Sequence, residues 1–318
     1  MSEFDLIRRY FADIGPVRPD AALGVGDDCA LLEIPPGQAL AVSIDTLVSG
    51  VHFFPDCDPE RLGHKSLAVG LSDLAAMGAE PAWSTLALTL PAVDEDWLRS
   101  FSRGFARLSA AHGVRLVGGD TTRGPLSVSV QVHGLVPPGG AIRRSGARPG
   151  DRVFVSGTLG DAGLALRQIL DGADVDEALR GRLECPEPRV RLGRGLRGLA
   201  TAMIDLSDGL AADLGHVLQA SGVGAELELA RLPLSPMVAD VVQRAGDWSL
   251  PLSSGDDYEL CFCAAEADAA RVEAIAQAAG CQVTAIGTLS KVSGLRCRLP
   301  SGDLLETGMT GYDHFSAG

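Results

Sequence analysis

The spacing of apolar residues along the first half of the chain alternates between helical and extended patterns. Three segments carry apolar residues at helical spacing or open like a helix: residues 4–14, 59–77 and 94–112. Shorter apolar segments between them predict strands at 39–45, 83–90, 115–117 and 126–135. This half is therefore expected to be mixed α/β.

A turn-rich segment separates this half from a second series of the same kind. Pro137-Pro138-Gly139-Gly140 and residues 143–150 are rich in turn formers, so we expect domains of residues 1–140 and 141–318. The second series predicts strands at 152–156, 202–205, 259–263 and 282–286, and helices from Asp161, from Asp208 and over 267–279. A chain of 318 residues that is 46% hydrophobic is long enough for two cores.

Composition narrows the class of protein. The formal charge of −14 argues against nucleic-acid binding, which uses clustered Lys and Arg. No apolar run approaches the roughly 18–20 residues of a membrane span, and the first residues lack the pattern of a signal peptide. Seven scattered cysteines without a CxxC pair indicate buried thiols, including Cys261 and Cys263 on one face of a strand. We therefore expect a cytoplasmic protein.

Aspartates recur beside glycines and at the ends of predicted strands. Strand-end carboxylates suit Mg²⁺, which takes oxygen ligands, and neighbouring glycines let a backbone approach a phosphate closely. The six sites are Gly24-Val25-Gly26-Asp27-Asp28, Asp45 in Ser43-Ile44-Asp45-Thr46, Asp73 in Leu71-Ser72-Asp73-Leu74, Gly118-Gly119-Asp120-Thr121-Thr122, Asp205-Leu206-Ser207-Asp208-Gly209, and Gly255-Asp256-Asp257.

Each aspartate also has a plainer interpretation. Asp208 could cap the helix that follows it, because Asp accepts hydrogen bonds from the first N–H groups of a helix. Asp73 lies within a predicted helix of small and apolar residues, where an unpaired carboxylate is costly, and this favours a ligand role. His52, after the strand that carries Asp45, is either an ordinary histidine or the polar edge of a ligand site.

Other sources of catalytic power are missing from the sequence. The chain contains no Walker A motif, no Gly-x-Ser-x-Gly elbow and no His-Glu-x-x-His motif, and its six histidines are widely spread. We therefore predict a magnesium-dependent phosphate-transferring enzyme without a protein nucleophile or base.

These motifs, taken in order, resemble those of the thiamine-monophosphate kinase family, in the aminoimidazole ribonucleotide synthetase-like ATP-binding superfamily. The resemblance spans essentially the whole chain. It rests on the first five of the sites above together with His52-Phe53, Ala75-Ala76-Met77-Gly78, Arg123-Gly124 and Gly311-Tyr312-Asp313-His314-Phe315.

The resemblance implies ATP-dependent phosphorylation of thiamine monophosphate to thiamine diphosphate, with several Mg²⁺ ions. It also implies a two-domain α/β (α+β) fold, with a mixed-sheet N-terminal domain that forms a homodimer and binds ATP and Mg²⁺, and a C-terminal α/β domain that completes the substrate site. Carried over by motif, the implied metal ligands are Asp28, Ser43, Ile44, Asp45, Asp73, Asp120, Asp205 and Asp208. The implied ATP contacts are Gly119, Asp120, Arg144 and Ser207, and the implied substrate contacts are His52, Asp256 and Tyr312.

Three of these assignments have alternatives. The family usually has glutamate where this chain has Asp256, which is one methylene shorter and contacts substrate either directly or through water. Arg143 could serve in place of Arg144, and Tyr312 could only anchor the C-terminus. The runner-up functions are an ATP-dependent synthetase or maturation enzyme of the same superfamily and a non-catalytic nucleotide or metal sensor.

Overall fold

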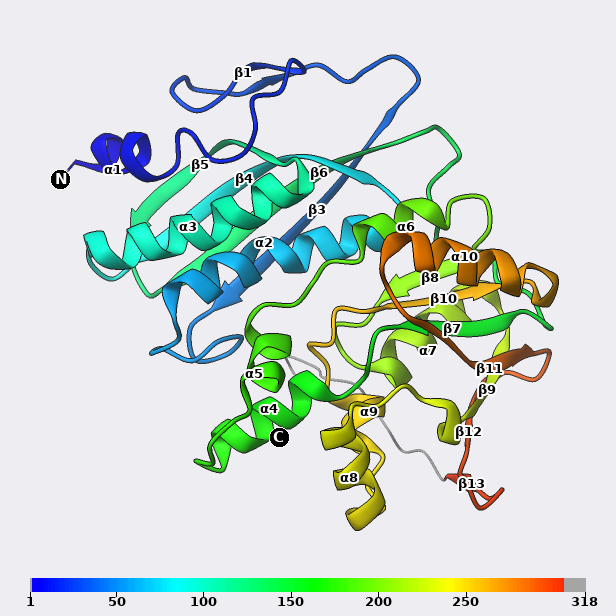
Figure 1. The fold of residues 1–318 in the computed structure, drawn as a ribbon. Coiled ribbons are helices and arrows are strands. Elements are labelled where there is room, and N and C mark those ends of the chain that lie inside the picture. The colour runs from blue at the N-terminus through cyan, green and yellow to red at the C-terminus, as the bar shows by residue number, and fades with distance from the viewer. Residues whose placement is uncertain (1, 306–318) are drawn as a thin grey trace. The chain divides into compact units, whose positions relative to one another are not determined.

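The computed structural model describes residues 2–305, which divide into two compact units (Figure 1). Unit 1 contains the residues up to Leu74 together with Ala79–Gly139, and unit 2 contains Ala75–Gly78 and the residues from Gly140 onward. Tyr312 lies outside the described residues.

Unit 1 is built on a four-stranded sheet with the order β3-β6-β4-β5. The pairs β3/β6 and β4/β6 are antiparallel, whereas β4/β5 is parallel. These strands are β3 (Ala39–Val48), β4 (Glu80–Leu90), β5 (Arg115–Arg123) and β6 (Ser127–Val136), and a separate antiparallel pair is formed by β1 (Ala21–Leu23) and β2 (Leu31–Leu32).

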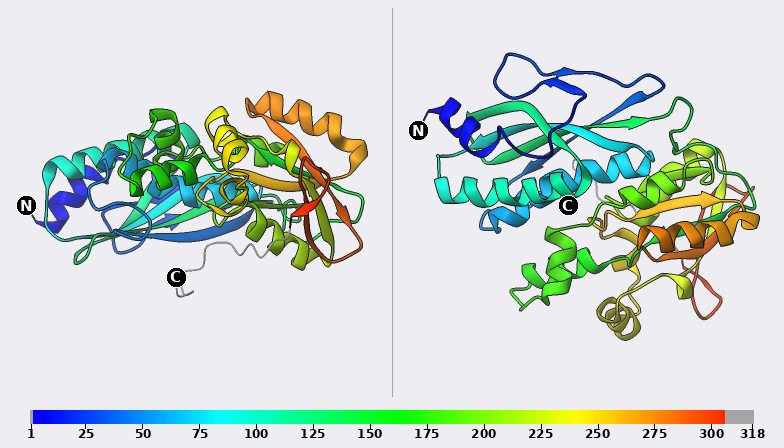
Figure 2. Two further views of the ribbon diagram at one scale, coloured as in Figure 1. Left: turned by 90° about the horizontal axis from the view of Figure 1, so that it is seen from below. Right: turned by 45° about the horizontal axis from the view of Figure 1, so that its top comes forward.

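Two long helices, α2 (Pro59–Ala76) and α3 (Glu95–His112), pack over one face of this sheet (Figures 1 and 2). They approach so closely that a Cβ atom on Gly104 would lie 1.8 Å from the carbonyl oxygen of Glu60, so only glycine fits there. The short α1 (Glu3–Tyr10) is capped by Ser2, and Phe11 just after it meets Phe101 of α3 edge to face. The core of unit 1 lies between these helices and the sheet.

Unit 2 contains a seven-stranded sheet within the described residues, in the order β13-β12-β9-β11-β7-β10-β8. Only β9/β12 is parallel among its pairs there. The strands are β7 (Arg152–Ser156), β8 (Ala202–Asp205), β9 (Gly224–Glu228), β10 (Leu260–Ala264), β11 (Val283–Ser290), β12 (Gly294–Arg298) and β13 (Leu304–Leu305).

Helices cover both faces of this second sheet, with α6 and α10 on one face and α7 on the other (Figure 1). Cys261 and Cys263 are buried in the core beside α7, which confirms their predicted packing role. The helices are α4 (Asp161–Leu170), α5 (Glu177–Glu184), α6 (Val190–Gly195), α7 (Leu210–Ser221), α8 (Pro236–Ala245), α9 (Ser249–Ser253) and α10 (Ala269–Ala279), with 3₁₀ turns η1 (Leu229–Arg231) and η2 (Glu266–Asp268).

The predicted α/β class is confirmed, and most predicted elements lie within a few residues of the observed ones. The largest difference is β5, which continues to Arg123 because parallel pairing with β4 carries it through the glycines that suggested a turn. The helix expected from Asp208 begins at Leu210, and the first helix ends at Tyr10. Within residues 2–305, no helix is long and apolar enough to cross a membrane.

Candidate functional site

Strand β3 and helix α2 bring three predicted metal ligands together in unit 1. Ser43 and Asp45 are two residues apart on β3, so their side chains share the face that α2 covers. The Ser43 hydroxyl donates a hydrogen bond to the Asp73 carboxylate. Asp45 Oδ2 lies over Gly70 of α2, where an added Cβ atom would come within 3.4 Å of it. The absence of a side chain at Gly70 leaves room for this carboxylate.

The electrostatics of this cluster are unfavourable for the protein alone. Asp45 Oδ2 is buried and has no hydrogen-bond partner among the described residues. Burial, and secondarily the negative charge of Asp73, raises the pKa of Asp45 to about 6. Two carboxylates in a partly buried position are stabilised by a cation placed between or beside them. The cluster therefore has the charge and the oxygen donors of a hard-cation site.

Mg²⁺ fits this donor set. Nowhere in residues 2–305 do three or more His, Cys, Asp or Glu side chains gather into a complete protein-only metal site. Mg²⁺ does not require one, because it is usually held by one or two carboxylates together with water and substrate phosphates. Asp45 and Asp73, supported by Ser43, could supply those carboxylates.

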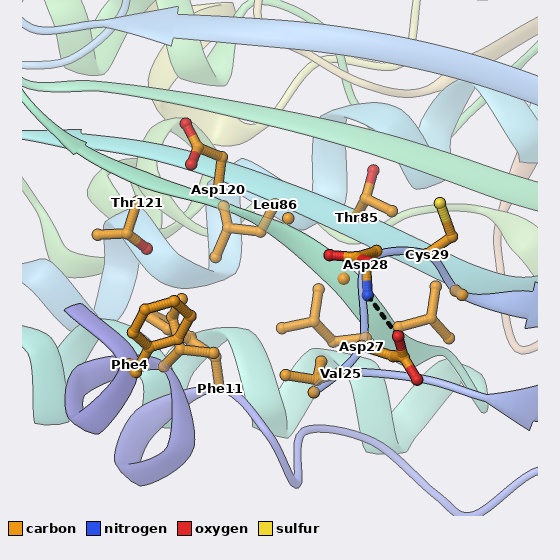
Figure 3. A pocket seen from close by; sticks show the side chains of 17 residues that line it. Phe4, Phe11, Val25, Asp27, Asp28, Cys29, Thr85, Leu86, Asp120 and Thr121 are labelled. Carbon is orange, nitrogen blue, oxygen red and sulfur yellow. Dashed lines mark hydrogen bonds between the residues drawn. The ribbon is translucent and has the colours of Figure 1, made fainter.

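A pocket of about 620 Å³ in unit 1 contains a second group of the predicted residues (Figure 3). Asp28 reaches it from the glycine-rich loop, and Gly119 and Asp120 reach it from β5. The rings of Phe4 and Phe11, at and after α1, form an apolar part of the wall. The pocket thus combines carboxylates, exposed glycine backbone and apolar surface, as a site for a phosphate-bearing ligand requires.

Local backbone geometry explains two features of this pocket. The N–H of Asp28 donates to Asp27 Oδ1 at 2.8 Å, which fixes the turn that carries both carboxylates (Figure 3). Gly119 has a φ of +155°, and a Cβ atom there would lie 1.8 Å from the carbonyl oxygen of Leu86. Glycine is therefore needed at 119 for β5 to pair with β4.

The sheet does not bring Asp120 to the Asp45–Asp73 cluster. Across the sheet from β5 to β3, the residues that lie opposite one another form rows. The row that begins at Asp120 ends at Thr46, and the adjacent row, which begins at Gly119, ends at Asp45. Adjacent rows point to opposite faces, and three inter-strand steps span about 14 Å. The Ile44 side chain is also on the face opposite Asp45 and is 62% exposed, so only its main chain could serve as the predicted ligand.

His52 is held in a tight turn just after β3. Its Nδ1 accepts a hydrogen bond from the N–H of Val48 at 3.0 Å, and its own N–H donates to the Val48 carbonyl at 2.9 Å. Because Nδ1 is the acceptor, the neutral ring carries its proton on Nε2. The turn fixes the ring, and His52 remains a predicted substrate contact.

In unit 2, two loops interlock and gather Ser207, Asp208 and Asp256. The N–H of Asp256 donates to the Ser207 carbonyl, and the N–H of Tyr258 donates to the Leu206 carbonyl, each at 2.8 Å. Asp256 and Tyr258 have φ values of +60° and +47°, a left-handed conformation that non-glycine residues rarely adopt. Asp205 precedes this junction at the buried end of β8.

The capping interpretation of Asp208 is wrong. Gly209 occupies the cap position of α7, and no side chain there bonds to the helix. The N–H groups of Asp208 and Gly209 instead donate to Asp213 Oδ2 at 3.0 and 3.1 Å. The Asp208 carboxylate is therefore not used as a cap, and its metal-ligand role stays a prediction.

Arg144 is not brought to Ser207. The Ser221 hydroxyl, at the C-terminal end of α7, donates to the Arg144 carbonyl at 3.2 Å. Ser207 precedes the opposite end of α7, whose 12 residues span about 18 Å. The Arg143 carbonyl accepts from the N–H of Met203 in the same region. Neither arginine shares the loop junction around Ser207.

Three buried carboxylates were not among the predicted site residues, although Asp257 belongs to one of the glycine-flanked sites. Asp213 is one, and burial raises its pKa to about 7 even though backbone N–H groups partly offset the effect. Asp257 accepts the N–H of Gly160 at the start of α4, and burial raises its pKa. Glu259 is fully buried and pairs with Arg182 at 2.7 Å and Arg189 at 2.6 Å.

A sequence signal was available for Asp213. Leu210, Leu214 and Val217 mark the buried stripe of α7, and Asp213 falls within that stripe at helical spacing. A carboxylate on the apolar face of a helix requires hydrogen-bond partners. Asp257 and Glu259 carry no such signal, because their partners come from distant segments.

Comparison with known proteins places this geometry in a family. Residues 26–136 match the model for the N-terminal domain of AIR synthase related protein, and residues 148–299 match that for its C-terminal domain. The thiamine-monophosphate kinase of Escherichia coli (strain K12) is 49% identical over 321 residues, which cover 99% of this chain and 98% of the relative.

Solved structures agree. The thiamine-monophosphate kinase from Stenotrophomonas maltophilia K279a is 46% identical, with a TM-score of 0.84 over 88% of this chain and 92% of that one. AaThiL complexed with AMPPCP and TMP is 30% identical, with a TM-score of 0.77 over 89% of each chain. The resemblance predicted from the motifs is confirmed: this chain is an enzyme of the thiamine-monophosphate kinase family, built from the two AIR synthase related domains.

Proposed function

We propose that this enzyme transfers the terminal phosphoryl group of ATP to the phosphate of thiamine monophosphate, giving thiamine diphosphate and ADP. The observation that carries the metal-dependent form of this proposal is the half-buried Asp45–Asp73 pair, in which Asp45 Oδ2 is buried and has no protein partner among the described residues. The complex of the similar protein AaThiL with AMPPCP and TMP supports the assignment of the two substrates. We expect an ATP-consuming enzyme of this kind in the cytoplasm.

The chemistry of the acceptor removes the need for a protein base. A phosphate monoester carries about −1.5 to −2 near neutral pH, because its second pKa is near 6. The attacking oxygen is therefore already largely ionised. We propose direct in-line transfer without a phosphoenzyme, in which the protein positions the two substrates. Radiolabel from γ-labelled ATP that remained on the protein as a kinetically competent intermediate would contradict this mechanism.

The main obstacle to transfer is then the repulsion between the negatively charged phosphates of ATP and of the acceptor. Mg²⁺ ions bound by the aspartates would reduce this repulsion. Two unit charges about 4 Å apart interact by roughly 4 kcal/mol at an effective dielectric constant near 20. Mg²⁺, when bound, would offset the negative charge of the phosphates. Asp45 and Asp73, with Ser43 and the main chain of Ile44, are proposed to hold Mg²⁺ at one place in unit 1. Asp28 and Asp120 are proposed to hold Mg²⁺ separately, at the pocket that they line. Asp205 and Asp208 are the proposed ligands of unit 2.

The proposed contacts to ATP and to thiamine monophosphate are likewise found in both units. Gly119 and Asp120, which line the pocket of unit 1, are proposed ATP contacts, and Ser207 is one in unit 2. His52 and Asp256 are proposed contacts to thiamine monophosphate. Arg144 remains a proposed ATP contact with no geometric support within unit 2. The fixed turns at His52 and Asp256 support their roles, because a positioned side chain loses little freedom on binding.

An ADP-release assay tests the proposal. Purified enzyme should release ADP from ATP only when thiamine monophosphate and Mg²⁺ are both present, and a chelator should stop release. A panel of other phosphate, amide and carbamoyl acceptors separates this kinase from a synthetase of the same superfamily. A sensor would bind the nucleotide without turnover. Inactivity of folded enzyme with thiamine monophosphate would overturn the assignment.

We also propose a homodimer formed through unit 1. Strand β3 is an edge strand, and on the sheet face opposite the helices it exposes Leu40, Val42 and Ile44 to 42%, 50% and 62%. Adjacent apolar side chains on an exposed edge strand favour association. Val42→Asp should convert the dimer to a monomer in light scattering. Val93 is exposed to a similar extent, 54%, but lies outside the sheet, so Val93→Asp should leave the molecular mass in solution unchanged. A monomeric wild-type enzyme would contradict the proposal.

A further inference from the structure

The turn at residues 206–209, in the proposed site of unit 2, is held by hydrogen bonds to other segments of the chain. It connects the buried end of β8 to α7, and it carries Ser207 and Asp208. The cap position just before α7 is occupied by Gly209, which has a φ of +107° and no side chain to satisfy the first N–H groups of the helix. Free N–H groups at the start of a helix need partners. Partners for this turn must therefore come from elsewhere.

Asp213 supplies them from one turn inside α7. Its Oδ2 accepts the N–H of Asp208 at 3.0 Å and the N–H of Gly209 at 3.1 Å. The Asp213 side chain is buried and the residue is 3% exposed, so water cannot easily replace it. Hydrogen bonds from backbone N–H groups to a carboxylate are stronger than bonds to a neutral acceptor. One buried oxygen thus holds two consecutive residues of the turn.

The other side of the turn is fixed by different groups. The carbonyls of Leu206 and Ser207 accept from the N–H groups of Tyr258 and Asp256, and a Cβ atom on Gly255 would lie 2.6 Å from the Ser207 carbonyl oxygen. The loop at 255–258 therefore holds the carbonyl oxygens, and Asp213 holds the N–H groups. Without Asp213, only one side of the turn would remain fixed.

We propose that Asp213 is a positioning residue that sets the direction of the Ser207 and Asp208 side chains for the nucleotide and its metal. Asp213 itself contacts neither substrate. This inference rests on the proposed function in assigning those two side chains to the nucleotide and metal, but the hydrogen bonds to the turn do not depend on that assignment. The two parts can therefore be tested separately.

The first test is hydrogen–deuterium exchange of the ligand-free enzyme, followed by mass spectrometry of peptides that cover residues 204–214. Asp213→Leu removes both acceptor oxygens but keeps the branched shape of the side chain. It should speed exchange at the Asp208 and Gly209 amides about tenfold, the effect expected for losing a bond of this kind. Asp213→Asn keeps one acceptor oxygen and should restore much of the protection. Unchanged exchange in folded Asp213→Leu would overturn the proposal.

If Asp213→Leu does not fold, Asp213→Asn decides the question alone. Its neutral oxygen is a weaker acceptor, so exchange at the same two amides should still be measurably faster than in the wild type. Wild-type exchange in Asp213→Asn, together with wild-type affinity for Mg-AMPPCP, would overturn the proposal.

The second test measures the affinity of Mg-AMPPCP by calorimetry, which requires no turnover and no acceptor. Asp213→Leu should raise the dissociation constant about tenfold, and Asp213→Asn should recover most of the loss. Asp151→Ala is the control, because Asp151 is a buried carboxylate of unit 2 that accepts the Arg148 N–H at 2.9 Å and the Thr201 hydroxyl at 2.7 Å. Thr201 precedes β8, whereas Ser207 and Asp208 follow the other end of that strand. Asp151→Ala should leave the affinity within about twofold of the wild type.

An equal loss of affinity in Asp151→Ala and Asp213→Leu would overturn the positioning role, because general loosening of unit 2 would explain both. Failure of the proposed function gives a different pattern. Wild-type enzyme would then not bind Mg-AMPPCP or would not release ADP, while the exchange at residues 208 and 209 would still respond to Asp213.

Discussion

Asp45 of unit 1 and Glu259 of unit 2 differ in how far the protein compensates the charge of their carboxylates. In unit 1, Asp45 and Asp73 lie close enough to repel each other, and one Asp45 oxygen has no hydrogen-bond partner among the described residues. In unit 2, Glu259 is fully buried but is paired with Arg182 and Arg189 and accepts the Ser156 hydroxyl. An uncompensated carboxylate indicates a site for a ligand, whereas a compensated one indicates a scaffold.

The pKa values express the same contrast. Burial and the charge of Asp73 raise the pKa of Asp45 to about 6. Burial alone would lower the pKa of Arg189, but the hydrogen bonds and charge of Glu259 outweigh burial and raise it. Unit 1 therefore keeps a charge that the protein itself does not stabilise. If this difference reflects function, substitutions of Asp45 should mainly lower the catalytic rate, and substitutions of Glu259 should mainly lower the stability of the fold.

The largest expected effect is on catalysis in unit 1. Asp45→Asn removes a proposed metal ligand at nearly constant shape and should lower the turnover rate by about 10²–10³-fold or more. Circular dichroism should show an unchanged fold. Asp96→Asn changes an exposed carboxylate of the same unit and should leave the rate unaltered. A near-normal rate of Asp45→Asn at saturating Mg²⁺ would remove Asp45 from the metal site.

The next largest effect is on the stability of unit 2. Glu259→Gln leaves two partly buried arginines without their counter-charge and should lower the free energy of unfolding by about 3–5 kcal/mol. Urea denaturation measures the change. Asp240→Asn breaks the exposed Arg244–Asp240 pair and should cost about 0–1 kcal/mol. Equal costs for the two variants would mean that Glu259 does not act as a scaffold.

A smaller effect of opposite sign is expected for the stability of unit 1. Asp45→Asn should raise the free energy of unfolding by about 2 kcal/mol in chelated buffer at neutral pH, because it removes a buried charge beside Asp73. Added Mg²⁺ should stabilise the wild type more than the variant. Urea denaturation with and without chelator measures both effects. A loss of stability in the variant would contradict the claim that the protein itself does not stabilise the Asp45 charge.

The pH dependence of that gain follows from the raised pKa. The native state holds the Asp45 proton more tightly than the unfolded state, whose pKa is near 3.8. Native stability from this group is therefore present below about pH 4 and is lost as pH rises through about 6. The advantage of Asp45→Asn should accordingly be absent near pH 3.5, appear across this window and be complete above it.

The smallest effect concerns His133 on β6. Burial lowers its pKa, although a hydrogen bond to the backbone of Trp83 partly offsets this. The unfolded state then binds a proton that the native state does not, so stability falls as pH decreases below about 6.5. His133→Gln should reduce the stability difference between pH 8 and pH 5.5 by less than about 1 kcal/mol. His216→Gln, at an exposed position, should not change it.

Much of the fold followed from local patterns. The strand at Arg152–Ser156, the start of α4 at Asp161 and the long helix α3 depend on runs and periodicities that local sequence displays. The shortest helices, α6 and α9, and the last two strands, β12 and β13, were missed because tertiary packing stabilises them. The extension of β5 was missed because cross-strand pairing with β4 overrides the turn preference of its glycines.

For the candidate site, too, some features could be predicted from local sequence and others depend on tertiary contacts. Glycine-flanked aspartates and the order of the motifs were enough to predict a phosphate-transferring enzyme and its family. They could not predict that Asp45 and Asp120 face opposite sides of one sheet, or that Arg144 is tied to the far end of α7 from Ser207. Strand register decides the first, and a loop contact decides the second.

By itself, the sequence determined the residue types, the α/β class and the family, because helix and strand periodicities and motif order are properties of the linear chain. Tertiary structure alone decided which carboxylates are compensated. Asp45 meets Asp73 across 28 residues, and Glu259 meets Arg182 across 77. Charge compensation depends on the distance between the charged groups in space, because their interaction weakens as that distance grows. Spacing along the sequence does not determine this distance.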